Sequence, residues 1–211
     1  MELPFTPDQF FSVFAEYNET FWLVVVALWF ATIAALILVW RQPEQWSPML
    51  SVFLGALWLW NAVAYHAFLF TRINPAAWIF SALFAVQAVL FLRAGQHGRA
   101  SYLSSSGAKQ VIGLALAAYS LAYPFMTMAL GHDYPSAPTF GLPCPTTILT
   151  IGVLLTVKGR VPVSLSAVPI VWSFIGGSAA ALLQVQTDYV LLAGGVLLLI
   201  AVAWPSRSIR Q

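Results

Sequence analysis

Residues 21–40 read FWLVVVALWFATIAALILVW, a run without a single charged side chain. A helix that crosses the hydrocarbon core of a bilayer needs about 20 predominantly apolar residues. The run therefore predicts a transmembrane helix over residues 20–40. It also indicates that the rest of the chain folds in a membrane.

The composition of the whole chain supports this assignment. The 211 residues are 60% hydrophobic and 8% charged, with a mean hydropathy of +0.83, whereas a soluble domain carries about 25% charged residues. The net charge of +2 comes without clustered Lys and Arg, which argues against nucleic acid as a partner. The single cysteine cannot form an intramolecular disulfide. The expected partner is the lipid bilayer.

Six further apolar segments follow the first, so the predicted fold is an all-α, polytopic membrane bundle of seven transmembrane helices. The expected spans are residues 20–40, 48–71, 75–92, 109–130, 143–157, 162–183 and 189–204. The pairs Gly176-Gly177 and Gly194-Gly195 fall inside the last two spans. Small residues at such positions favour close helix packing over a hinge.

The distribution of charge predicts how the bundle is oriented. With seven spans the two termini lie on opposite sides, and an outer N-terminus leaves only Arg72 of the nine basic residues outside. The basic residues on the inner side are Arg41, Arg93, Arg99, Lys109, Lys158, Arg160, Arg207 and Arg210. Positively charged loops stay on the cytoplasmic side, so we expect the N-terminus outside and the C-terminus inside.

The N-terminus carries its own helix signal. Thr6, Pro7 and Gln9 form a T-x-x-Q capping box with proline at the first helical position. Apolar residues then recur at helical spacing, which predicts an amphipathic helix over residues 7–18 on the outer membrane surface. A simple lead-in turn to the first span is the alternative. The expected organisation is an outer helix (1–19), a transmembrane domain (20–204) and a short basic cytoplasmic tail (205–211).

The stretch 131–147, GHDYPSAPTFGLPCPTT, is the least membrane-like part of the chain. It contains four of the thirteen prolines and the only cysteine. Non-helical backbone at membrane depth is tolerated only where protein or water satisfies its polar groups. The predicted topology makes this stretch the outer connection between the fourth and fifth spans, where we look for a site.

Polar side chains converge on the same outer half of the bundle. Polar groups within spans usually face the bundle interior and mark functional sites, so we expect a ligand site there. The candidate ligand-binding residues are Asn61, Tyr65, His66, Arg72, Tyr123 and Cys144. Trp58, Asn61, Tyr65 and Arg72 are expected on one helix face. The start of the fifth helix, assisted by Arg72, would suit an anion.

Metal binding is a second possibility for these residues. His66, His132, Asp133 and Cys144 together offer nitrogen, oxygen and sulfur ligands suited to zinc or copper, although no ligand spacing supports the set. Haem held by two histidines is not expected, because only one histidine lies within a span. Retinal is not expected either, since no lysine lies in the middle of a span to form a Schiff base.

Three stretches carry a resemblance to a known family: YPSAPTFGLPCPTT (134–147), PFTPDQF (4–10) and AEYN (15–18). With these motifs the chain resembles an uncharacterised family of bacterial seven-helix integral membrane proteins. The resemblance implies a multi-pass protein of the bacterial inner membrane. It implies no activity, cofactor or substrate.

The leading functional hypothesis is a protein that binds or transports a small solute or ion through the outer polar site. A metal- or thiol-dependent membrane enzyme is one alternative, with His132, Asp133 and Cys144 at the outer surface. A non-catalytic sensor or subunit, in which the N-terminal helix docks a partner, is another. Oligomerisation is compatible with all three.

Overall fold

The computed structural model describes residues 4–98 and 100–204, and this part of the chain is all-α. Its seven α-helices are α1 (Pro7–Arg41), α2 (Pro43–Trp60), α3 (Ala77–His97), α4 (Gly107–Ala129), α5 (Pro143–Leu155), α6 (Val163–Leu182) and α7 (Tyr189–Ala203). Three short helical turns join them: the π-helix η1 (Asn61–Ala67) and the 3-10 helices η2 (Phe70–Arg72) and η3 (Gln186–Asp188). All seven predicted segments correspond to these helices.

Six of the helical segments in the described residues are long and apolar enough to cross a membrane, and α5 is an apolar but shorter helix. The chain is therefore a multi-pass membrane protein. Three of the basic residues used in the prediction of topology, namely Arg99, Arg207 and Arg210, lie outside the described residues, as does the predicted tail 205–211.

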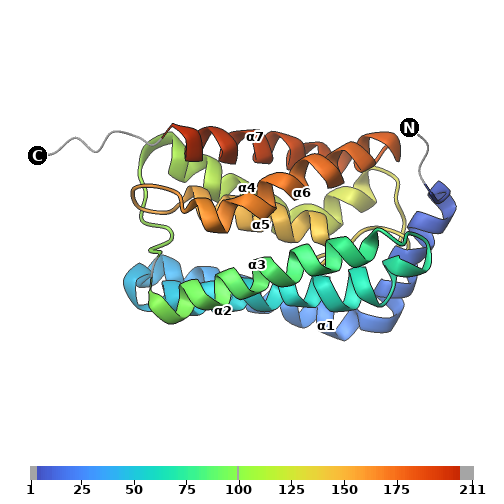
Figure 1. Ribbon diagram of the computed structural model, residues 1–211, viewed down its shortest axis with the longest axis horizontal. Helices are drawn as coiled ribbons and strands as arrows, with labels where there is room; N and C mark the ends of the chain where they lie inside the picture. The colour runs from blue at the N-terminus through green and yellow to red at the C-terminus, as the bar shows by residue number, and fades with distance from the viewer. Residues whose placement is uncertain (1–3, 99, 205–211) are drawn as a thin grey trace, which may run out of the picture.

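The helices run side by side along the length of the molecule, and consecutive helices pack in the pairs α2–α3, α4–α5 and α6–α7 (Figure 1). The bundle thus has two ends. We call the one where α1 begins the N-terminal end, which also holds η1, η2, residues 130–142 and η3. The opposite one, where α7 ends, is the C-terminal end.

Helix α1 contains the two predicted helical segments, joined directly at a kink. It continues from Pro7 to Arg41 and bends at Phe21, whose φ of −116° and ψ of 16° are non-helical. This kink falls next to the predicted boundary between residues 18 and 20. Because no glycine or proline follows Pro7 within this range, no loop separates the two helices. The capping box is confirmed: Thr6 Oγ1 accepts from Gln9 N at 3.2 Å, and Thr6 N donates to Gln9 Oε1 at 2.8 Å.

The first part of α1 folds onto the bundle. Val13, Phe14 and Tyr17 are buried, in one apolar cluster with Tyr65 and Phe70 of the α2–α3 connection. We call residues 4–20 the cover segment, because its apolar face lies against the N-terminal end of the protein. Its predicted position on the membrane surface stays a prediction.

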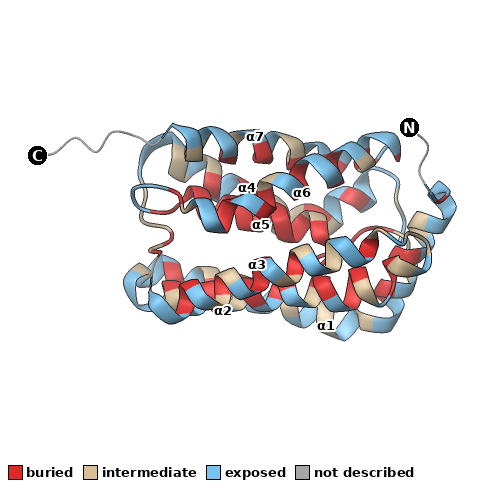
Figure 2. Cartoon of the chain, viewed as in Figure 1, coloured by how far each residue is buried: buried red, intermediate tan, exposed pale blue. Residues whose placement is uncertain are grey.

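Helix α5 forms the centre of the bundle. It contacts α2, α4, α6 and α7, and every one of its residues except Cys144 is buried (Figure 2). Its contact with α4 depends on two glycines that face each other. A Cβ atom added to Gly113 would lie 2.6 Å from the carbonyl oxygen of Gly152. The backbones of α4 and α5 therefore approach as closely as small residues permit in membrane proteins.

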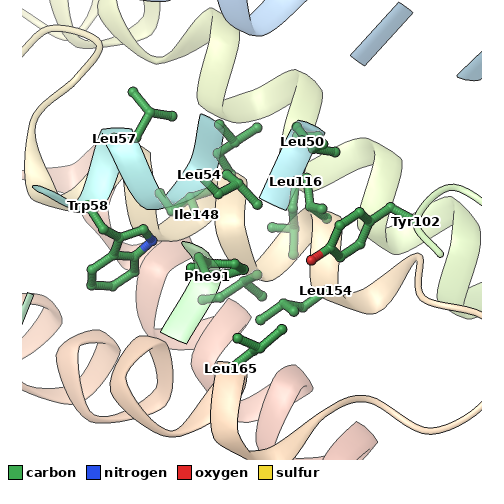
Figure 3. Close-up of a cluster of buried hydrophobic side chains, with 14 of the residues drawn as sticks. Leu50, Leu54, Leu57, Trp58, Phe91, Tyr102, Leu116, Ile148, Leu154 and Leu165 are labelled. Carbon is green, nitrogen blue, oxygen red and sulfur yellow. The ribbon is translucent and has the colours of Figure 1, made fainter. Parts of the chain in front are cut away.

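The core beside α5 is made of leucines and aromatic rings from α2, α3, α5 and α6 (Figure 3). Hydrogen bonds join this core across helices. Trp58 Nε1 donates to Thr150 Oγ1 at 2.9 Å, and the hydroxyls of Ser51 and Tyr102 are 2.8 Å apart. Tyr102 comes from the connection between α3 and α4, and burial raises its pKa to about 12. Its phenol is therefore neutral and ties this connection to α2.

Candidate functional site

A cavity of about 240 Å³ opens at the N-terminal end of the bundle. Its walls come from the cover segment, the α2–α3 connection, α3, α4, residues 138–145, α6 and η3. Aromatic rings form a large part of the wall, contributed by Phe5, Phe10, Phe14, Tyr65, Phe70, Phe80, Tyr123 and Trp172. A concave, mainly apolar pocket with few polar groups is the usual form of a small-molecule site.

Asp188 is the carboxylate of this cavity. It is only 6% exposed, and Tyr123 donates its hydroxyl to Asp188 Oδ1 at 2.6 Å. Among the described residues the only ion pair is that of Arg72 with Glu16, so no basic side chain of this part of the chain lies within 4.0 Å of Asp188. An ionisable side chain at membrane depth is costly to keep and marks a functional site by default.

Helix α4 holds Asp188 in place through two tyrosines one turn apart. Tyr119 donates to the backbone oxygen of Thr187 at 2.8 Å, and Tyr123 donates to Asp188 itself. Both bonds reach the 3-10 turn η3, which connects α6 to α7. The turn is thereby drawn inward and its carboxylate faces the cavity instead of the bulk solvent.

Three of the six predicted ligand-binding residues meet at this cavity: Tyr65, Tyr123 and Cys144 all line it. They come from three elements, namely η1, α4 and the first turn of α5. The thiol of Cys144 lies beside Asp188 and the ring of Trp172. Their predicted positions at a similar depth in the bundle already indicate that these three residues lie close together.

Two other predicted residues lie behind the wall. Asn61 is buried and donates to Leu57 O at 2.8 Å and to Thr146 Oγ1 at 3.1 Å. His66 is fully buried, its ring centre 4.6 Å from that of Phe84 and 5.1 Å from that of Trp172. Neither ring nitrogen of His66 has a hydrogen-bond partner among the described residues. Both residues belong to η1, and π-helical turns occur frequently at functional sites.

Arg72 lies outside the cavity. Its guanidinium donates to Glu16 Oε1 at 2.6 Å and stacks 4.9 Å from the ring centre of Phe68. The expected single face of Trp58, Asn61, Tyr65 and Arg72 assumes a regular α-helix. The wider π-turn of η1 and the tighter 3-10 turn η2 change the residue spacing, so Arg72 is at the surface while the other three are buried.

The four predicted metal ligands are not brought together. His132 stacks on Phe11 with ring centres 4.9 Å apart, and Asp133 is exposed in the same loop. His66 is enclosed by aromatic rings, and Cys144 faces the cavity. Within residues 4–98 and 100–204, no three His, Cys, Asp or Glu side chains come together as a potential metal site.

The 131–142 loop serves instead to hold the cover segment. Asn18 donates through Nδ2 to the carbonyl oxygens of Pro135 and Ala137, and its Oδ1 accepts from the hydroxyl of Thr139. Asn18 is 1% exposed. All its polar atoms are thus committed to this loop.

The first turn of α5 offers few backbone N–H groups to the anion that we expect at a helix N-terminus. Pro143 and Pro145 have no backbone N–H, and Thr146 N already donates to Leu142 O at 3.1 Å. Only Cys144 retains a free donor among these four positions, and the Asp188 carboxylate lies beside it. Two negative charges would repel each other there, so this arrangement disfavours an anionic ligand.

Sequence reasoning missed the residues that give the cavity its character, Asp188 and Trp172. Asp188 stands at the boundary between the sixth and seventh predicted spans, where a carboxylate is expected to face water. The sequence does contain a signal for Asp188. An ionisable side chain near a span is costly to keep in a membrane, and this argument applies to Asp188 as it does to His66.

Comparisons with known proteins assign the chain to a family. No curated protein and no solved structure matches the chain. Residues 7–211, nearly the whole chain, match a family of unknown function, DUF6064. These residues include all seven helices and every residue of the cavity except Phe5. The chain, a multi-pass membrane protein, therefore belongs to DUF6064, a family of unknown function.

Proposed function

We propose that the protein binds a small solute in this cavity and carries it into or across a bacterial inner membrane. The observation that carries the proposal is the pairing of an aromatic wall with the buried carboxylate of Asp188, next to Tyr123 and Cys144. Such a wall removes the apolar part of a ligand from water, while a few fixed polar groups orient it.

The charge distribution supports an orientation with the cavity outside. Of the described basic residues Arg41, Arg93, Lys109, Lys158 and Arg160 belong to the C-terminal end, and only Arg72 belongs to the N-terminal end. Because basic loops remain cytoplasmic, the N-terminal end and its cavity face the periplasm. The cover segment then rests at the outer surface as an amphipathic helix, and solute enters beside it.

This orientation predicts the behaviour of reporter fusions in a bacterial inner membrane. Green fluorescent protein fused after Gln211 is expected to fluoresce, since it folds in the cytoplasm. Alkaline phosphatase fused after Asp133 is expected to be active, and the same enzyme fused after Gly159 inactive, because it matures only in the periplasm. The reverse pattern of the two phosphatase fusions would contradict the proposed orientation.

Occupancy of the cavity can be followed through Cys144, the only cysteine of the chain. The small neutral reagent methyl methanethiosulfonate should modify it in the folded protein, and the neutral probe 2-phenylethanol should slow that reaction by filling the apolar space. A larger side chain that fills the cavity should also slow the reaction. Ala179→Trp places an indole in the cavity from α6, so we expect modification to slow by about tenfold or more.

The matched control is Val171→Trp, on the same helix but on its outward, 46% exposed face. It should react at the wild-type rate. Mass spectrometry of the intact protein measures the modified fraction over time. Equal rates in wild type and Ala179→Trp would refute the assignment of this cavity as the binding site.

A further inference from the structure

The charge of the cavity narrows the class of solute. Among the described residues, Asp188 is the only carboxylate that lines the cavity, and none of these lining residues is Lys, Arg or His. Tyr123 supplies a neutral donor to one of its oxygens, which leaves the negative charge itself uncompensated by the described residues. Burying an unpaired carboxylate is expensive unless a charge of opposite sign accompanies it. A cation bound in the cavity would provide that charge.

The aromatic lining is suited to the same kind of ligand. Ring follows ring along the wall: Phe10 lies 4.6 Å from Phe14, Tyr65 lies 5.4 Å from Phe70, and Phe80 lies 5.4 Å from Trp172, measured between ring centres. The face of an aromatic ring is electronegative and attracts a cation, more strongly where water is excluded. The rings therefore add to the field of Asp188.

An inorganic cation fits this arrangement less well. Divalent ions such as Mg²⁺ and Ca²⁺ require six or more oxygen ligands, and the side chains that line the cavity offer few oxygens besides the Asp188 carboxylate. The described residues contain no cluster of three potential metal ligands. Most of the lining is apolar, so the bound species must carry apolar groups of its own.

We propose that the cavity binds an organic monocation, an ammonium group on an apolar or aromatic body, with Asp188 as its counter-charge and Tyr65, Phe70 and Trp172 among the surrounding rings. This inference rests on the proposed function and names the class of its solute. Asp188 and Tyr123 orient the ammonium group, and the phenylalanines of the cover segment enclose the apolar part.

The experiment compares two probes that differ in charge alone, 2-phenylethylamine, which is an ammonium ion at pH 7, and neutral 2-phenylethanol. Each is titrated against the modification of Cys144 by methyl methanethiosulfonate in the purified full chain. For wild type, we expect the amine to give half-protection at a concentration about tenfold lower than the alcohol. In Asp188→Asn this preference should vanish, with the protection by the alcohol retained.

Two further variants test whether the charge of Asp188 causes the preference for the amine. Asp188→Glu keeps the charge and should keep most of the preference for the amine. Asp133→Asn removes an exposed carboxylate from the same end of the bundle and should leave the preference unchanged. Each protection curve is normalised to the rate of the same variant without probe, because Asp188 lies beside the thiol.

The outcomes distinguish the two proposals. Equal protection of wild type by amine and alcohol would overturn the organic cation and keep the cavity as a solute site. Preference for the amine that survives Asp188→Asn would overturn Asp188 as counter-charge. Protection by neither probe would overturn both proposals. The wild-type comparison alone tests the class of solute if the Asp188→Asn protein does not fold.

Discussion

Gly152→Leu is expected to prevent α4 and α5 from packing and to lower the free energy of unfolding by more than about 3 kcal/mol. A Cβ atom at this position would lie 2.7 Å from the carbonyl oxygen of Gly113 and 2.8 Å from the backbone nitrogen of Ala117. Both neighbours are backbone atoms of α4, so no side-chain rotation relieves the clash. The midpoint of thermal unfolding in detergent, followed by fluorescence-detected size exclusion, measures the loss.

The control for this substitution is Ala118→Leu, which adds a comparable side chain to an exposed position of α4. Its unfolding midpoint should stay close to that of wild type. If Gly152→Leu unfolds at the same temperature as Ala118→Leu, the close contact between the two helices is not what stabilises the centre of the bundle.

Asn18→Ala is expected to release the cover segment. The substitution leaves the carbonyl oxygens of Pro135 and Ala137 without their donor, and Thr139 without its acceptor. Each buried polar group left unpaired costs about 1–3 kcal/mol. Since about 1.4 kcal/mol changes an equilibrium tenfold, opening of the cavity should become at least about tenfold more frequent. Cys144 should then react with methyl methanethiosulfonate correspondingly faster.

Ser12→Ala is the matched control, because Ser12 lies in the same segment and its hydroxyl bonds only to Gln9 O, at 2.8 Å. It should leave the rate of Cys144 modification unchanged. An unchanged rate in Asn18→Ala as well would show that solute reaches the cavity by a route that the cover segment does not control.

The fold of this chain was largely predictable, because a membrane-spanning helix is visible in the sequence as a long apolar run. The charge-free run 21–40 and the capping box at Thr6 both led to correct helices. The position of α5 at the centre was not predictable. Every helix of the bundle is apolar on most of its surface, so hydropathy does not distinguish a helix facing lipid from one enclosed by protein. Burial of α5 on all sides is a property of the packing.

The candidate site was predicted in part for a related reason. Depth along a span can be counted from the sequence, and Tyr65, Tyr123 and Cys144 do meet in space. The sequence does not show, however, that the connection between α6 and α7 folds back into the bundle. Asp188 enters the cavity only because Tyr119 and Tyr123 bind its turn. Arg72 leaves the expected face because η1 and η2 depart from α-helical spacing.

The enclosure of α5 has a consequence for how the protein is made. At about 1.5 Å per residue, its 13 residues span only about 20 Å, less than the roughly 30 Å of hydrocarbon that a helix has to cross. On leaving the ribosome it has neither the length to hold itself across the bilayer nor its later neighbours, since α6 and α7 are not yet synthesised. The final packing of this helix therefore requires residues 163–203, so about the last fifth of the chain completes the enclosure of its centre.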